Sequence, residues 1–299
     1  AYGNNGLYSN IFDIDPDQYL RTTGVSIGFG KRLQWPDDYF VLNADLTFQN
    51  YSLKNWLYFI MSNGSSNNLN LGLTIGRNSI DNPIYTRKGS SFSLTAQLTP
   101  PYSLFSDKDY SQITDDAERY QWLEFHKWKF KSRVYTPLSS NQKLVLMTRA
   151  EYGFLGYYNK YRKSPFETFL VGGDGMSGYS TFATDIVGLR GYSSGSLTPY
   201  AYSYDESGTL RKTQNGYVYS RLTMELHYPV ILEGFTTIYV LGFVEAGNCW
   251  SNFSEFNPFN LKRSAGVGVR LFLSMVGMMG VDWGYGFDWV DGENKTNGR

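Results

Sequence analysis

Apolar and polar residues alternate with a period of two through most of the chain, and this pattern constrains the fold more than any other feature. Residues 42–48 read Leu-Asn-Ala-Asp-Leu-Thr-Phe, and residues 92–98 read Phe-Ser-Leu-Thr-Ala-Gln-Leu. Successive side chains of a β-strand point to opposite faces, so each segment would have one apolar and one polar face. The pattern therefore predicts an all-β chain whose strands separate an apolar environment from a wet one.

Segments with this alternation recur about eleven times. They lie near residues 20–33, 39–58, 66–80, 88–101, 120–137, 141–156, 165–172, 216–229, 235–250, 261–274 and 277–290. Many supply the ~9–11 residues that a strand needs to cross a bilayer, and short turns alternate with long loops, as in outer-membrane barrels. The predicted fold is an antiparallel transmembrane β-barrel. A soluble β-sandwich is the alternative that the alternation alone leaves open.

Composition and motifs narrow the function. The chain has 27 basic and 27 acidic residues, so no overall field attracts nucleic acid or another charged partner. Its one cysteine, Cys249, and its two distant histidines, His126 and His227, offer neither a disulfide framework nor metal-ligand spacing. The sequence contains no nucleophile elbow or phosphate-binding loop. These observations predict a protein that is not an enzyme and has no cofactor, metal or nucleic-acid partner.

One predicted strand carries a row of positive charges. Its basic residues share one face, while the tryptophan, phenylalanine and valine between them share the other; the basic residues are Lys127, Lys129, Lys131 and Arg133. Four cations on one face require water or counter-charges, and Glu124 and Glu151 are the nearest acidic candidates in neighbouring segments. We expect this basic stripe to line a hydrated barrel lumen; attraction of an acidic partner is the less favoured interpretation.

The longest predicted loop, residues 172–215, contains the most distinctive motif. Two glycines open it, and a further glycine precedes the tetrapeptide Leu-Arg-Gly-Tyr; the motif residues are Gly172, Gly173, Gly188, Leu189, Arg190, Gly191 and Tyr192. Here the chain resembles the superfamily of BamA, TamA and the two-partner secretion transporters. That superfamily has a Gly-Gly segment followed by (Val/Ile)-Arg-Gly-(Phe/Tyr) in its sixth extracellular loop. This chain has leucine where valine or isoleucine is more common.

Three further segments resemble motifs of the same superfamily, and together with the loop motif they occur along the chain in the correct order. Residues 79–85, Ser-Ile-Asp-Asn-Pro-Ile-Tyr, resemble its S-x-D-N-x-x-(F/Y)-P segment, with Thr86 in place of proline. Residues 243–250 resemble its F-x-D-x-G-x-x-W segment, with Glu245 in place of aspartate, and residues 263–270 resemble its R-x-S-x-G-x-G strand. The motifs span roughly residues 77–290, and their combination is more specific than any one of them.

The motif arginine has two expected partners. An arginine between glycines at a loop tip can fold back into a barrel lumen, where its planar guanidinium suits bidentate binding to carboxylates. Glu225 and Glu245 lie on the predicted inward faces of adjacent strands, and the resemblance implies that Arg190 contacts these acidic positions to hold the loop inside. Without the motif, the simpler expectation for Arg190 would be an exposed loop residue with no fixed partner.

The resemblance also implies a larger protein. It predicts a barrel of about sixteen strands, of which this chain supplies about the fifth to the fifteenth. Residues 1–299 would then form one domain, a partial barrel with residues 172–215 inserted in the lumen. The periplasmic POTRA domains and the first and last barrel strands would lie outside the chain.

The implied function is assembly of other outer-membrane proteins. By resemblance, the protein would be the central insertase of the β-barrel assembly machinery in the outer membrane of a Gram-negative bacterium, working without an energy source. Its expected partners are unfolded outer-membrane proteins, periplasmic chaperones, accessory lipoproteins and the lipid bilayer. A polypeptide translocation pore of the two-partner secretion type and a plain porin or adhesin barrel are the alternatives.

Overall fold

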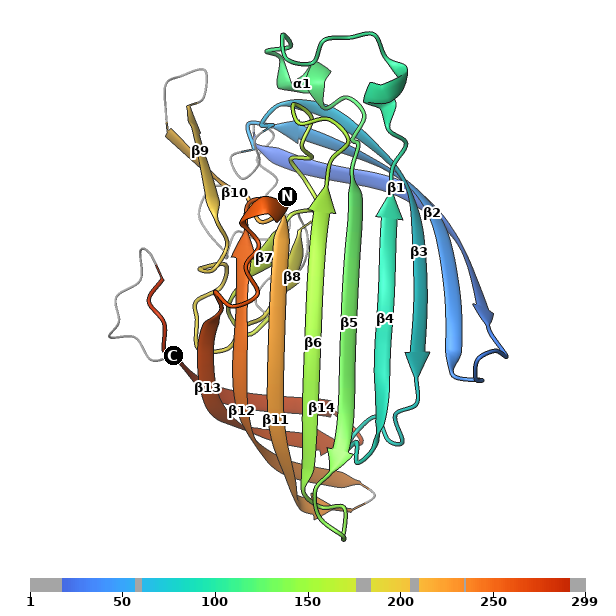
Figure 1. Ribbon diagram of the computed structural model, residues 1–299, viewed down its shortest axis with the longest axis vertical. Coiled ribbons are helices and arrows are strands. Elements are labelled where there is room, and N and C mark those ends of the chain that lie inside the picture. The colour runs from blue at the N-terminus through green and yellow to red at the C-terminus, as the bar shows by residue number, and fades with distance from the viewer. Residues whose placement is uncertain (1–17, 57–60, 176–183, 205–209, 234, 291–299) are drawn as a thin grey trace.

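A single antiparallel sheet of ten strands dominates the computed structural model (Figure 1). The structure describes residues 18–56, 61–175, 184–204, 210–233 and 235–290. In sheet order the strands are β1 (Tyr19–Arg32), β2 (Phe40–Lys54), β3 (Gly64–Asn78), β4 (Gly89–Leu98), β5 (His126–Pro137), β6 (Val145–Gly156), β11 (Val218–Leu232), β12 (Thr236–Trp250), β13 (Lys262–Leu273) and β14 (Gly277–Gly286). The sheet curves strongly, so that one face is concave. Within the described residues, β1 and β14 are its two edges and do not pair with each other.

The two faces of the sheet differ in chemistry, as the alternation predicts. Large apolar side chains are exposed on the convex face; on β11, for example, these are Leu222, Met224 and Leu226. The intervening residues Thr223 and Glu225 are buried on the concave side. Exposed apolar surface of this extent on a whole face suits contact with lipid rather than water. The fold is therefore that of an antiparallel transmembrane β-barrel, with the polar face as the lumen wall.

One predicted barrel strand does not belong to the main sheet. The segment 165–172 forms only the short strand β7 (Phe169–Val171), which pairs in parallel with β8 (Asp185–Val187). Both lie inside the curve of the main sheet (Figure 1). The prediction of a barrel strand here was wrong because the alternating residues Phe169 and Val171 pack into the protein core instead of facing lipid. The barrel part of the described chain accordingly has ten strands, one fewer than predicted.

The remaining elements lie at the end of the sheet with the long connections. There, β4 leads through the 3-10 helix η2 (Tyr102–Phe105) and the short helix α1 (Asp116–Arg119) to β5. The hairpin of β9 (Tyr200–Tyr204) and β10 (Leu210–Gln214) lies at the same end, and a second 3-10 helix, η3 (Phe253–Glu255), joins β12 to β13. None of the helices in the described ranges is long and apolar enough to cross a membrane.

The apolar core fills the lumen at this end of the sheet. It joins residues of the loop before β11 to strand residues of the wall, and two aromatic contacts illustrate the packing. Tyr51 of β2 stacks on Phe166 with ring centroids 4.7 Å apart, and Phe169 of β7 meets Tyr219 of β11 edge to face at 4.7 Å. Burial of these large side chains stabilises the base of the loop by the hydrophobic effect. The loop that follows β7 is therefore anchored on the concave face.

Candidate functional site

The two glycines that open the loop fix the path of the motif tetrapeptide. Gly172 has φ +125° and Gly173 has φ +80°, which glycine adopts without the strain that a side chain would add. The amide of Gly172 donates to the carbonyl of Val187 at 3.0 Å, and the amide of Gly173 donates to the carbonyl of Tyr192 at 3.0 Å. Gly173 also forms an isolated antiparallel bridge with Leu189, whose side chain is fully buried. These contacts hold the tetrapeptide against the start of its own loop.

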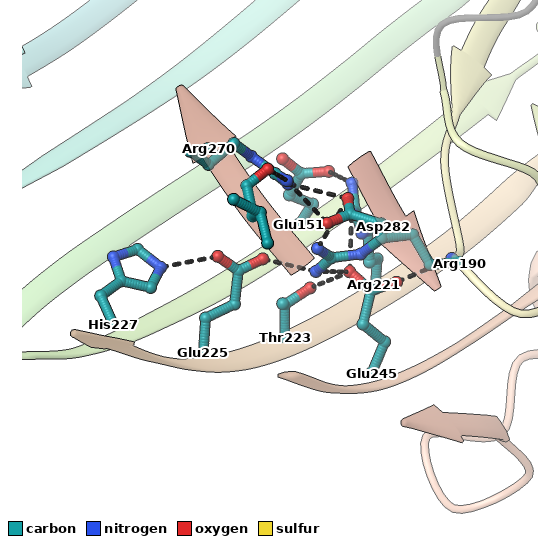
Figure 2. A network of polar contacts seen from close by, with 10 residues as sticks. Glu151, Arg190, Arg221, Thr223, Glu225, His227, Glu245, Arg270 and Asp282 are labelled. Atoms are coloured by element: carbon teal, nitrogen blue, oxygen red, sulfur yellow. Dashed lines mark hydrogen bonds and ion pairs between the residues drawn. The ribbon is translucent and has the colours of Figure 1, made fainter. Parts of the chain in front are cut away.

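Arg190 points from this loop into a group of carboxylates on the lumen wall (Figure 2). Its Nη2 donates to Glu245 Oε1 at 2.8 Å and to Glu225 Oε1, while its backbone amide donates to Glu245 Oε2 at 2.8 Å. Its Nη1 donates to Asp282 Oδ2 at 3.3 Å. The structure thus brings Arg190 together with both glutamates that the sequence named, on the adjacent strands β11 and β12, and adds Asp282 of β14.

Each of these three acids also contacts a cation or histidine of the wall. Glu245 Oε1 accepts from Arg221 Nη2 at 2.8 Å, and Asp282 Oδ1 accepts from Arg270 Nη1 at 2.6 Å. Glu225 Oε2 lies 2.8 Å from Nε2 of His227. Every acid of the group is therefore shared between the loop and the wall (Figure 2).

The surroundings of Arg190 favour its charged form. Burial disfavours the charge, but the negative charges of Glu245 and Glu225 outweigh burial and raise the pKa of Arg190 above its ordinary value. The guanidinium also lies over the ring of Phe243, with Cζ 3.6 Å from the ring centroid, which is a cation–π geometry. The arginine is consequently a permanent cation held by both charge and packing.

The last two residues of the tetrapeptide dock on β13 and β14. Gly191 has φ +89°, and a Cβ there would lie 2.8 Å from the backbone of Gly286 and of Tyr285. The hydroxyl of Tyr192 donates to the carbonyl of Arg263 at 2.7 Å and accepts from the amide of Asp288 at 3.3 Å. The loop therefore needs a glycine at this point, because its backbone touches the backbone of the strand.

Gly188, the glycine before the tetrapeptide, meets the loop's own backbone. A Cβ on Gly188 would lie 2.8 Å from the amide nitrogen of Gly175 and 2.9 Å from the backbone of Asp174. Such distances are shorter than any side chain tolerates. All seven predicted motif residues are thus within one compact segment on the concave face.

The basic stripe on β5 divides into two halves. Lys127 Nζ lies 2.8 Å from Asp185 Oδ2 and 3.2 Å from Glu167 Oε2, and Lys129 Nζ lies 3.1 Å from Asp185 Oδ2. Burial acts to raise the pKa of Asp185, but the two lysines outweigh it and lower that pKa to about 2. Lys131 and Arg133 form no ion pair with any described residue. The basic stripe lines the lumen. Its first half, Lys127 and Lys129, is neutralised by Asp185 of the loop and by Glu167 just before β7.

The counter-charges expected for the basic stripe have other partners. Glu124 is fully buried and pairs with Arg162 Nη1 at 3.0 Å. Glu151 is opposite Lys131 in the strand register but forms its ion pair with Arg221, at 3.6 Å. The sequence could not show this, because Arg162 and Arg221 reach these carboxylates only once loop and strands are assembled.

Four participants in the Arg190 site were missed from sequence: Arg221, His227, Arg270 and Asp282. All four lie on polar faces of predicted strands, so the alternation placed them in the lumen. What the alternation lacks is the register between strands, which decides whether Asp282 of β14 meets the loop. Asp282 is opposite Gly268 of β13, and the absence of a side chain there leaves room for the Arg270–Asp282 pair.

A strongly curved antiparallel sheet with an apolar convex face and a loop bound inside it defines the class of transmembrane β-barrels with a lumen loop. The Omp85 superfamily domain matches residues 6–298. The chain belongs to the Omp85 superfamily, an outer-membrane barrel family.

Solved structures support the fold. The crystal structure of BamA from Haemophilus ducreyi lacking POTRA domains 1–3 aligns with a TM-score of 0.66 at 18% sequence identity. The alignment covers 92% of this chain and 52% of that one, so the chain spans about half the length of the structure it matches. No curated protein sequence matches the chain.

Proposed function

We propose that the chain is the barrel portion of a BamA-type insertase, which folds and inserts other outer-membrane proteins and is not an enzyme. Membership of the Omp85 superfamily and the fold of the BamA barrel support this proposal. The observation that carries it furthest is the contact of Arg190 with Glu225 and Glu245, which fixes the loop in the lumen.

The physical task of such an insertase is to satisfy backbone groups. An unpaired strand edge in lipid leaves its amides and carbonyls without partners, at a cost of several kcal/mol each. A barrel that offers a strand edge can pair with an incoming strand and remove this cost without an energy source. The partners would be unfolded outer-membrane proteins, delivered by periplasmic chaperones, together with accessory lipoproteins and the bilayer of a Gram-negative outer membrane.

The test is the substitution Arg190→Ala in the full protein. The control is Arg87→Ala, because Arg87 is an exposed residue of the turn between β3 and β4. We expect Arg190→Ala to reduce the assembly of other outer-membrane proteins in cells depleted of the wild-type copy. Barrel folding, measured by gel mobility with and without heating, should persist because wall cations still neutralise Glu245 and Asp282.

Two other outcomes would change the assignment. Unchanged assembly together with unchanged barrel stability in Arg190→Ala would rule out the insertase role of the loop. If assembly is unchanged but export of a secreted polypeptide is lost, the translocation pore of the two-partner secretion type becomes the better assignment, because that class shares the loop motif.

A further inference from the structure

The half of the basic stripe that forms no ion pair, Lys131 and Arg133, faces a cavity on the concave side of the sheet. Lys131 and Arg133 of β5 and Arg149 of β6 line this cavity, whose volume is about 450 Å³. None of the three side chains forms an ion pair with any residue that the structure describes, in contrast to Lys127 and Lys129. Three cations that form no ion pair with the described residues thus line one cavity.

The strand register places two of these cations directly opposite each other. Arg133 pairs with Arg149 in the antiparallel ladder of β5 and β6. Like charges at directly opposed positions of a sheet destabilise it. The Nε atom of Arg149 is in addition buried without a hydrogen-bond partner, which is a costly state for a guanidinium. An anion bound between the two strands would offset the repulsion between Arg133 and Arg149 and would give the Arg149 guanidinium an acceptor.

The carboxylates that line the same cavity are already occupied. Glu225 and Asp282 are bound by Arg190, and Glu151 pairs with Arg221 at 3.6 Å. Asp174, on the loop side of the cavity, also has an interaction of its own. The wall therefore has no spare acid for the three cations, and their positive charge is directed into the cavity.

We propose that this cavity binds a small multivalent oxyanion, of the kind found in phosphate compounds and in di- and tricarboxylates. Guanidinium groups bind the planar edges of such anions with paired, charge-assisted hydrogen bonds. Lys131 and Arg133 are exposed to the lumen, whereas Arg149 is partly buried, and that burial strengthens its bonds. The cavity volume lies within the range of small-molecule sites. Arg133 and Arg149 would share the anion from opposite strands, with Lys131 as a third contact. The site goes beyond insertion of client proteins and does not depend on that role.

The experiment measures binding of two probes to the full protein in detergent micelles by isothermal titration calorimetry. Inorganic pyrophosphate tests phosphate chemistry and citrate tests carboxylate chemistry, each against sodium chloride of equal ionic strength. We expect saturable binding of at least one probe, and the preferred probe identifies the chemistry. Arg149→Gln and Arg133→Gln should each weaken binding by about tenfold or more, because each removes charge-assisted bonds.

Arg87→Gln serves as the matched control, since it removes the same charge from an exposed turn. It should leave the affinity unchanged. Melting without a probe gives an independent readout: Arg133→Gln should melt at the same temperature as the wild type or higher, because it removes a like-charge contact. The proposal is overturned if neither probe binds saturably, if Arg87→Gln weakens binding as much as Arg149→Gln, or if Arg133→Gln melts lower than the wild type without a probe.

Discussion

At the level of single residues, Arg190 binds acids that also have a partner on the lumen wall. Each acid that receives Arg190 also contacts a wall residue, namely Arg221, His227 or Arg270. Removing a partner from a buried ion pair is costly when it leaves an isolated charge behind. Withdrawal of Arg190 leaves Glu245 with Arg221 and Asp282 with Arg270. Removal of Arg190 therefore leaves neither of these two carboxylates as an isolated charge.

Glu245 should be the acid on which the site depends most. Its side chain is fully buried and accepts from Arg190, Arg221 and Thr223. Glu245→Gln leaves buried guanidinium groups under-compensated, so we expect a loss of about 3 kcal/mol in unfolding free energy. Asp282→Asn should cost about 1 kcal/mol, because Asp282 is more exposed and meets Arg190 only at 3.3 Å.

Urea unfolding in lipid vesicles, followed by tryptophan fluorescence, measures both values. Equal losses for Glu245→Gln and Asp282→Asn would show that burial does not rank these acids. The same pair shows what the sequence could predict: Glu245 came from a motif, whereas Asp282 required the fold.

At the level of elements, glycines of β14 shape the surface on which the loop docks. A Cβ on Gly286 would lie 2.7 Å from the carbonyl oxygen of Gly191 and 2.9 Å from the ring of Tyr192. We expect Gly286→Val to push the tetrapeptide off the strand and to cost about 1–3 kcal/mol by overpacking. Gly242→Val is the control, because Gly242 of β12 has nothing within 4 Å of its Cβ position.

Protease sensitivity of the loop in the intact barrel measures this displacement. The loop should become more sensitive in Gly286→Val and stay as resistant as the wild type in Gly242→Val. Loops of equal resistance in the two variants would mean that close contact with β14 does not hold the tetrapeptide.

Strands were predictable from alternation where one face meets lipid, and less so where both faces meet protein. The segments that became β2, β4 and β11 have long, regular alternation and were placed correctly. The segment 165–172 also alternates, yet Phe169 and Val171 are buried in the core beside the loop. Alternation reports burial of one face and does not reveal whether lipid or protein covers that face.

At the level of the whole molecule, the convex face is apolar and the concave face is charged, so the sheet has a fixed orientation toward lipid and water. The alternation was sufficient to predict this division. The arrangement of charges within the lumen was not predictable, because the acids that pair with Arg162, Arg221 and Arg270 depend on strand register and on the path of the loops, which alternation does not give. The division into faces makes a direct prediction for two neighbouring residues of one strand.

Leu46 and Thr47 of β2 point to opposite faces of the sheet. Leu46 is 51% exposed on the convex face, and Thr47 lies beside Asp45 on the concave face, with its hydroxyl 3.4 Å from Asp45 Oδ2. Leu46→Arg puts a cation in lipid, which costs about 2–4 kcal/mol near the middle of a bilayer. Thr47→Arg puts the same cation beside a carboxylate and water, so its cost should be below about 1 kcal/mol. Urea unfolding in lipid vesicles compares the two variants directly. A larger loss for Thr47→Arg would reverse the assignment of the faces and, with it, the placement of Arg190 inside a lumen.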